Sequence, residues 1–245
     1  WRNKWAGIMT QKLLELIDQG ITKTEDAKEK REYLGGSFIG EFCNRKIQYK
    51  TLATDPDEDR KIKPKIYRIF DRGHDGEDRM INYLKKAGLI IRTEKQDGSQ
   101  YGFSKVGGMF RGHIDGLIVG TKDDIDVGFN TPAIWENKVL NHTSFTHLKN
   151  HGLKKSKPLY YAQLQIYIYF MDEKKNPALF TYMNANDCEI GAYVVPYDGV
   201  LVVELLNKAE TIINAVKSNE LLPRGTDDPD GFMCRFCEFK ARCWA

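Results

Sequence analysis

The chain has 245 residues, of which 41% are hydrophobic and 29% charged, and 37 Lys and Arg against 34 Asp and Glu give a net charge of +3. This composition excludes a disordered or fibrous chain, and no stretch reaches the roughly 18 uncharged apolar residues of a membrane span. The small net charge excludes a histone-like basic surface, although a local basic stripe is sufficient to bind nucleic acid. We find no signal peptide and expect an intracellular protein, cytoplasmic or nucleoid-associated. Because the first residue is Trp1 rather than Met, we also expect a few residues to precede it.

The spacing of apolar residues predicts helices at both ends of the chain and a sheet between them. We predict helices at residues 5–17 (closed by Gly20), 22–31, 38–43 (capped by Ser37), 74–86 (closed by Gly88), 158–171 and 200–216. We predict strands at 89–92, 101–106, 112–119, 133–139, 179–183 and 192–195, the first four forming a β-meander. Residues 55–65 contain two prolines and predict a loop. The pattern predicts an α/β or α+β protein in which helices precede and follow a sheet of about four or five of these strands.

Two neighbouring strand patterns carry carboxylates and a lysine. Asp115 lies between glycines in one of them, and Glu136 and Lys138 lie in the next. Because side chains alternate along a strand, Glu136 and Lys138 point the same way, toward Asp115 on the neighbouring strand. Two carboxylates suit Mg²⁺ or Mn²⁺, and a lysine beside them can orient a water, help to deprotonate it, or stabilise charge on a phosphate. The alternative is a salt bridge at a strand edge.

Residues on two helices extend this pattern. His74 opens a helix upstream of the sheet, where it is either a nitrogen ligand of the same metal or a structural histidine. Gln163 and Tyr167 are four residues apart, so they share a helix face. They either reach the scissile phosphate region or belong to a partly buried amphipathic helix.

The order of these motifs resembles the RecB-like branch of the PD-(D/E)XK nuclease superfamily, which typically shows a helical His, a Gly-x-x-Asp strand, a Glu-x-Lys strand and a Gln-x₃-Tyr helix. The matching residues here are Gly73-His74, Gly112 to Asp115, Glu136 to Lys138 and Gln163 to Tyr167. The resemblance implies a central mixed sheet flanked by helices. It also implies metal ligation by His74, Asp115, Glu136 and the main-chain carbonyl of Asn137, with Lys138 as the catalytic lysine. Gln165 and Tyr169 repeat the spacing of the last motif, which leaves two registers open.

The five cysteines predict a second metal site. Cys234, Cys237 and Cys243 form a C-x₂-C-x₅-C pattern, and three soft ligands this close usually share a metal. The fourth ligand is either Cys43 or Cys188. The segment around Cys43 resembles the N-terminal signature of iron–sulfur RecB-like nucleases, including the CRISPR-adaptation nucleases and AddB-type nuclease domains. That resemblance implies a 4Fe-4S cluster held by Cys43, Cys234, Cys237 and Cys243, with a structural Zn²⁺ as the alternative.

Two basic stretches, residues 61–68 and 149–157, have tyrosines nearby and suit a path for single-stranded nucleic acid, or are ordinary solvated faces. We expect one nuclease domain over residues 1–245. It would comprise an N-terminal helical segment (1–72), a nuclease core (73–217) and a C-terminal cluster segment (218–245), with the cluster joining the two ends. The expected activity is metal-dependent hydrolysis of DNA, exonucleolytic at single-stranded ends, in recombination, repair or CRISPR-type end processing. The alternatives are an endonuclease acting with protein partners in a larger complex and a non-catalytic DNA-binding module. No membrane partner is expected.

Overall fold

The computed structural model describes residues 2–171 and 175–245, and side chains from residue 10 onward, so Trp5 and the rest of the first apolar repeat up to residue 9 lie outside the described side chains. The strands are β1 (Leu34–Gly35), β2 (Leu89–Arg92), β3 (Gly102–Lys105), β4 (Phe110–His113), β5 (Gly116–Thr121), β6 (Ala133–Leu140), β7 (Ala178–Asn184) and β8 (Ile190–Val195). The helices are α1 (Arg2–Asp26), α2 (Asn44–Thr51), α3 (Pro64–Lys86), α4 (His142–His151), α5 (Leu153–Ser156), α6 (Pro158–Phe170), α7 (Gly199–Ser218), α8 (Phe232–Arg235) and α9 (Lys240–Trp244). Short 3₁₀ turns lie at Glu58–Arg60, Val106–Gly108 and Lys122–Asp124.

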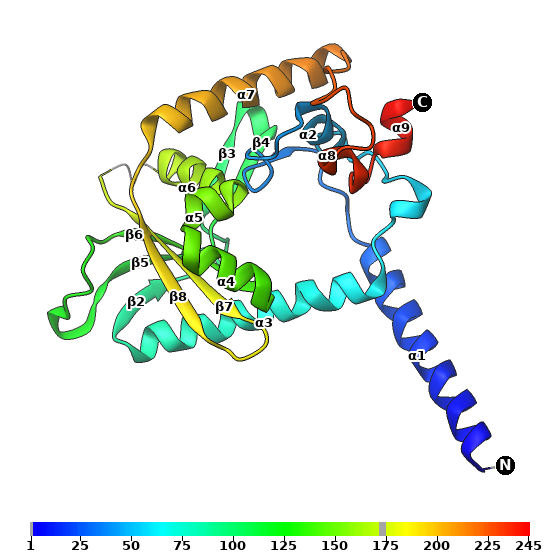
Figure 1. The fold of residues 1–245 in the computed structure, drawn as a ribbon. Helices are drawn as coiled ribbons and strands as arrows, with labels where there is room; N and C mark the ends of the chain where they lie inside the picture. Colours follow the sequence, from blue (N-terminus) through cyan, green and yellow to red (C-terminus); the bar gives the residue numbers. More distant parts are fainter. Residues whose placement is uncertain (1, 172–174) are drawn as a thin grey trace.

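The described strands form two mixed sheets. The larger sheet has the order β2-β5-β6-β7-β8, in which only the central pair β6–β7 is parallel. The smaller sheet has the order β1-β4-β3, with β1 parallel to β4. The sequence-based prediction of an α/β fold with a mixed sheet flanked by helices is therefore confirmed (Figure 1).

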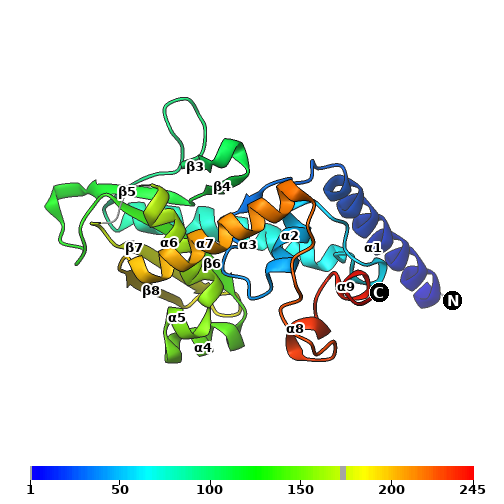
Figure 2. The same cartoon turned by 90° about the horizontal axis from the view of Figure 1, so that it is seen from above.

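Helices cover both faces of the larger sheet. α3 lies along one face, where its Met80 and Ile81 pack on residues of β2, β5, β6 and β7. α4 and α6 cover the opposite face, and α7 packs on α6 and α2, so that the three helices enclose the larger core (Figures 1 and 2). β6 is buried on both faces, which is the arrangement expected of a central strand. The polar side chains of Glu136 and Asn137 on β6 are consequently kept from water.

Several predicted elements differ from the structure. α1 runs through Gly20 to Asp26, because one glycine costs a helix only about 1 kcal/mol. Ser37 lies in a turn and does not cap α2, which begins after Cys43. The predicted meander is wrong, since the segment 112–119 divides into β4 and β5, which belong to different sheets. α4 was missed because only Phe145 and Leu148 of its face are buried.

The segment from α2 to Asp57 contacts the C-terminal segment directly. In α2, the side-chain amide of Gln48 donates to the Glu220 carbonyl at 2.6 Å and accepts from the Leu222 N–H at 3.0 Å. The carboxylate of Asp57 accepts from the main-chain N–H groups of Ala241 and Arg242 at the start of α9. Figures 1 and 2 accordingly show α2 beside α8 and α9, while α1 projects away from the body.

α3 packs closely on β6, and two glycines of α3 provide a matched pair of substitutions that test this contact. A Cβ at Gly76 would lie 2.3 Å from Cγ2 of Val139, whereas a Cβ at Gly73 meets nothing within 4 Å. We predict that Gly76→Ala lowers the free energy of unfolding by about 1–3 kcal/mol through overpacking. Gly73→Ala should raise it by about 0.5–1 kcal/mol through helix propensity. Urea unfolding of both variants measures this, and equal effects would contradict the close approach of α3 to β6.

Candidate functional site: a buried carboxylate pair and a four-cysteine cavity

Glu136 and Lys138 project from the same face of β6, as the alternation of a strand requires. The Glu136 side chain is almost completely buried, and only 1% of the residue is exposed. Its Oε1 accepts hydrogen bonds from the Lys138 ammonium and from Nε2 of Gln163, the latter at 2.6 Å. Both hydrogen bonds are made to this same carboxylate oxygen.

Asp115 reaches the same place from the junction of β4 and β5. β5 pairs antiparallel with β6, and the register sets Gly116 opposite Trp135. The main-chain N–H of Asn137 donates to Oδ2 of Asp115 at 2.8 Å, and Lys138 Nζ lies 3.9 Å from the same oxygen. The structure thus brings the three residues of the predicted carboxylate–lysine pattern together.

Burial and mutual repulsion set the charge of this group. Removal from water, and then the neighbouring Asp115 carboxylate, raise the pKa of Glu136 to about 8. Burial acts to lower the pKa of Lys138, but the Glu136 and Asp115 carboxylates outweigh it, so that its pKa is raised and the ammonium keeps its proton.

The second oxygen of Glu136 marks a place for a cation. Oε2 is buried and has no hydrogen-bond partner among the described residues. An unsatisfied buried polar atom costs about 1–3 kcal/mol, and more when charged. Oxygen ligands on β6 and at the junction of β4 and β5 suit a hard cation such as Mg²⁺ or Mn²⁺. Within the described residues, however, no group of three or more His, Cys, Asp or Glu side chains is arranged to hold a metal ion.

The two registers of the Gln-x₃-Tyr motif face opposite sides of α6. Gln163 donates to Glu136 as described and also to the hydroxyl of Tyr167 at 3.2 Å. Gln165 instead donates to the Pro196 carbonyl at 3.0 Å and accepts from the Asp198 N–H at 2.7 Å, which ties α6 to the segment after β8. Gln163 and Tyr167 therefore form the pair at the site. Both are buried against Glu136 rather than directed outward.

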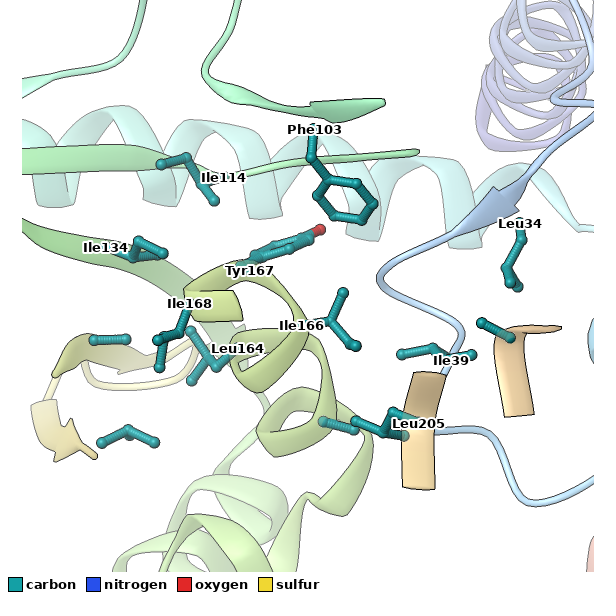
Figure 3. Packing of buried hydrophobic residues seen from close by; sticks show 14 of the residues in the cluster. Leu34, Ile39, Phe103, Ile114, Ile134, Leu164, Ile166, Tyr167, Ile168 and Leu205 are labelled. Atoms are coloured by element: carbon teal, nitrogen blue, oxygen red, sulfur yellow. The ribbon is translucent and has the colours of Figure 1, made fainter. Parts of the chain in front are cut away.

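Two glycines leave room for the Tyr167 ring. A Cβ at Gly112 would lie 2.6 Å from Cε1 of Tyr167, and one at Gly36 would lie 2.8 Å from it. The ring extends from α6 toward Phe103 of β3, as Figure 3 shows, at a centroid separation of 6.1 Å. Gly112 of the Gly-x-x-Asp motif thus has a steric role three residues before Asp115.

His74 and Glu77 lie one turn apart on α3 but differ in surroundings. His74 is exposed and has no hydrogen bond or ion pair within the described part of the chain. Glu77 is half-buried, and burial followed by the Asp115 charge raises its pKa to about 7. The sequence analysis missed Glu77. Its position three residues after His74, on the face that packs on the sheet, was the available signal.

The four predicted cluster cysteines line one cavity between α2 and the C-terminal segment. Its volume is about 30 Å³, and its lining includes Cys43, Cys234, Cys237 and Cys243. Cys188 does not line it, and lies exposed with a positive φ in the turn before β8. The arrangement favours Cys43 over Cys188 as the partner of the three C-terminal cysteines, although the thiols do not form a ready-made ligand set.

Two cationic side chains, Arg45 and Lys46, lie beside the cysteine cavity. Nη1 of Arg45 donates to Sγ of Cys243 at 3.6 Å. Burial raises the pKa of the Cys237 thiol, while Lys46 acts in the opposite direction. A side chain at Gly225 would meet Sγ of Cys43 at 3.2 Å, so glycine lets the chain pass close to that sulfur. Four thiolates around a metal would gain from both cations.

Half of the Lys and Arg residues in the two basic stretches form ion pairs within the described part of the protein. Lys149 bonds Glu189 at 2.6 Å and Lys154 bonds Asp198 at 2.8 Å, while Lys61 bonds Glu58 at 2.9 Å. Exposed pairs of this kind are worth only about 0–1 kcal/mol, so a phosphate can replace the acidic partner at little cost. Tyr160 lies nearer to the carboxylates, with Lys138 Nζ 5.6 Å from its ring centroid.

Comparisons with known proteins relate the chain to others by its fold. No family model and no curated protein matches its sequence. LHK-Exo, an alkaline exonuclease from Laribacter hongkongensis, matches with a TM-score of 0.53 at 15% identity, over 78% of this chain and 91% of that chain. The same exonuclease in complex with dAMP matches with a TM-score of 0.50 at 14% identity, over the same shares. A third structure, SSO0001, gives a TM-score of 0.47 at 14% identity, over 95% of this chain and 96% of that one.

No described helix combines the length and the apolar character needed to cross a bilayer.

At the identities above, the likeness concerns the fold alone. The chain has a nuclease-like α/β fold, similar in structure to an alkaline exonuclease.

Proposed function

We propose that the protein is a metal-dependent deoxyribonuclease that removes nucleotides from single-stranded DNA ends. The observation that carries this proposal is the buried carboxylate of Glu136, with Asp115 and Lys138 beside it and one oxygen that has no hydrogen-bond partner in the described part of the chain. The fold shared with LHK-Exo supports it, and the dAMP complex of that enzyme shows a mononucleotide bound by a protein of this fold.

The residues divide the work of phosphodiester hydrolysis. Asp115, Glu136 and the main-chain carbonyl of Asn137 would hold Mg²⁺ or Mn²⁺, which supplies Lewis-acid polarisation and neutralises phosphate charge when bound. The Lys138 ammonium stabilises negative charge that develops on the phosphate and orients the attacking water. Gln163 positions the Glu136 carboxylate by its hydrogen bond to Oε1, and Tyr167 accepts a second hydrogen bond from the same amide.

One prediction concerns Asp115, Glu136 and Lys138. Asp115→Asn, Glu136→Gln and Lys138→Ala should each lower cleavage of end-labelled single-stranded DNA at least about 100-fold. DNA affinity measured in EDTA should change little, because the lysines of the two basic stretches (61–68 and 149–157) remain. Glu210→Gln removes an exposed carboxylate of α7 outside the site and serves as the control, with full activity expected.

The DNA substrate separates the proposed exonuclease from its alternatives. Cleavage of linear but not circular single strands is the expected result. If the protein cuts circular strands, it is an endonuclease. If the wild-type protein binds DNA without cutting it, it is a DNA-binding module. Near-wild-type cleavage by Lys138→Ala would remove that lysine from the mechanism.

A second prediction compares the two candidate ligands on α3. We expect Glu77→Gln to weaken Mn²⁺ binding about tenfold, as loss of a site carboxylate does. His74→Ala should weaken it less, since His74 is exposed whereas Glu77 feels the Asp115 charge. Calorimetric titration of both variants without DNA measures the difference. A larger loss in His74→Ala would restore histidine as the helical ligand.

A third prediction concerns the cysteine cavity, which we propose holds a 4Fe-4S cluster on Cys43, Cys234, Cys237 and Cys243. Freshly purified protein should be brown, with broad absorbance near 400 nm. Substituting any of the four cysteines by serine should bleach it and lower its melting temperature, and Cys188→Ser is the matched control. Colourless protein with one zinc per chain would assign a structural Zn²⁺ instead, and bleaching by Cys188→Ser alone would exclude Cys43.

A further inference from the structure

A chain of three buried side chains lies behind the carboxylate pair, on the face of the sheet covered by α3. β6 and β7 run parallel with Asn137 opposite Thr181. Nε1 of Trp135 donates to Oγ1 of Thr181 at 2.9 Å, and Oγ1 of Thr181 donates to Oδ1 of Asn137 at 2.9 Å. The three residues are at most 5% exposed, so water does not compete for these bonds.

The direction of the hydrogen bonds fixes the orientation of Asn137. An indole N–H can only donate, so Trp135 occupies a lone pair of the Thr181 hydroxyl and leaves its proton for the next acceptor. That acceptor is the amide oxygen of Asn137. The amide nitrogen then points elsewhere and has no partner among the described residues. The hydrogen bond from Thr181 to the amide oxygen therefore sets which way the Asn137 amide is turned.

Asn137 also touches the candidate site through its main chain. Its N–H donates to Oδ2 of Asp115 at 2.8 Å. Its neighbours in sequence, Glu136 and Lys138, point to the opposite face of β6 and form the rest of the site. Whatever fixes the Asn137 peptide therefore fixes Asp115 directly and its two neighbours through the strand.

We propose that Trp135 and Thr181 are positioning residues that hold the Asn137 peptide, and with it Asp115, in the geometry that binds a divalent cation. This inference rests on the function proposed above. Neither side chain touches the reacting atoms. Both act through Asn137, as the outer partners of metal ligands commonly do, and loss of such a partner typically lowers metal affinity 10–100-fold.

The test uses threonine variants of the full chain. Thr181→Val keeps the shape of the side chain and removes the hydroxyl, whereas Thr181→Ser keeps the hydroxyl. We expect Thr181→Val to raise the Mn²⁺ dissociation constant, measured by calorimetry without DNA, about tenfold. The Mn²⁺ concentration for half-maximal DNA cleavage should rise in parallel, and DNA affinity in EDTA should stay at the wild-type value. Thr181→Ser should remain within about twofold of wild type.

Thr51→Val is the matched control. Thr51 is also a buried threonine, 4% exposed, and its hydroxyl donates to the Ile47 carbonyl at 2.9 Å within α2. Loss of that bond should lower the melting temperature as Thr181→Val does, with Mn²⁺ affinity unchanged. If Thr181→Val fails to fold, Trp135→Phe replaces it, because it removes the indole donor from the same chain and keeps an aromatic ring, although the smaller ring leaves a buried space.

Wild-type Mn²⁺ affinity in Thr181→Val, an equal loss in Thr51→Val, or no rescue by Thr181→Ser would each overturn the positioning role. These results would leave the proposed nuclease standing, provided the wild type binds Mn²⁺ and cleaves DNA. A wild-type protein that does neither would overturn both.

Discussion

The arrangement of the site depends on one carboxylate that is kept out of water. Glu136 lies on a strand buried on both faces, and within the described residues only its Oε1 has hydrogen-bond partners, Lys138 and Gln163. Leaving Oε2 unpaired there costs free energy that the surrounding packing must offset. Burial, and then the neighbouring Asp115 carboxylate, disfavour its charged form and raise the pKa of Glu136 to about 8, and a divalent cation shared with Asp115 would offset both effects.

The remainder of the fold brings distant segments to this carboxylate. α6 lies over it because glycines at positions 36 and 112 admit the Tyr167 ring, and α3 lies against the other face because Gly76 allows close approach to Val139. The ends of the sequence meet away from the carboxylates, where Gln48 and Asp57 bond the C-terminal segment directly. The cysteine cavity lies between them, so a metal there would reinforce a contact that the polypeptide already makes.

The sequence predicted local features well and long-range ones unevenly. Strand alternation placed Glu136 and Lys138 on one face, and most strand bounds agree within two residues, because these depend on neighbouring side chains. The separation of β4 from β5 depends on pairing with distant β1 and β6, which no local pattern shows. Glu77 escaped notice for the same reason, since its importance comes from Asp115, remote in sequence. The choice between Gln163 and Gln165 also needed the helix orientation, because both spacings are equally good.

The central claim is that a divalent cation occupies the place beside Oε2 of Glu136. A crystal structure of the protein soaked in Mn²⁺, with data collected for the anomalous signal of manganese, tests it most directly. An anomalous peak about 2.1 Å from Glu136 Oε2 and from a carboxylate oxygen of Asp115 is the predicted result. A map with no peak there, and with the Lys138 ammonium or a water bonded to Oε2 instead, would contradict the claim.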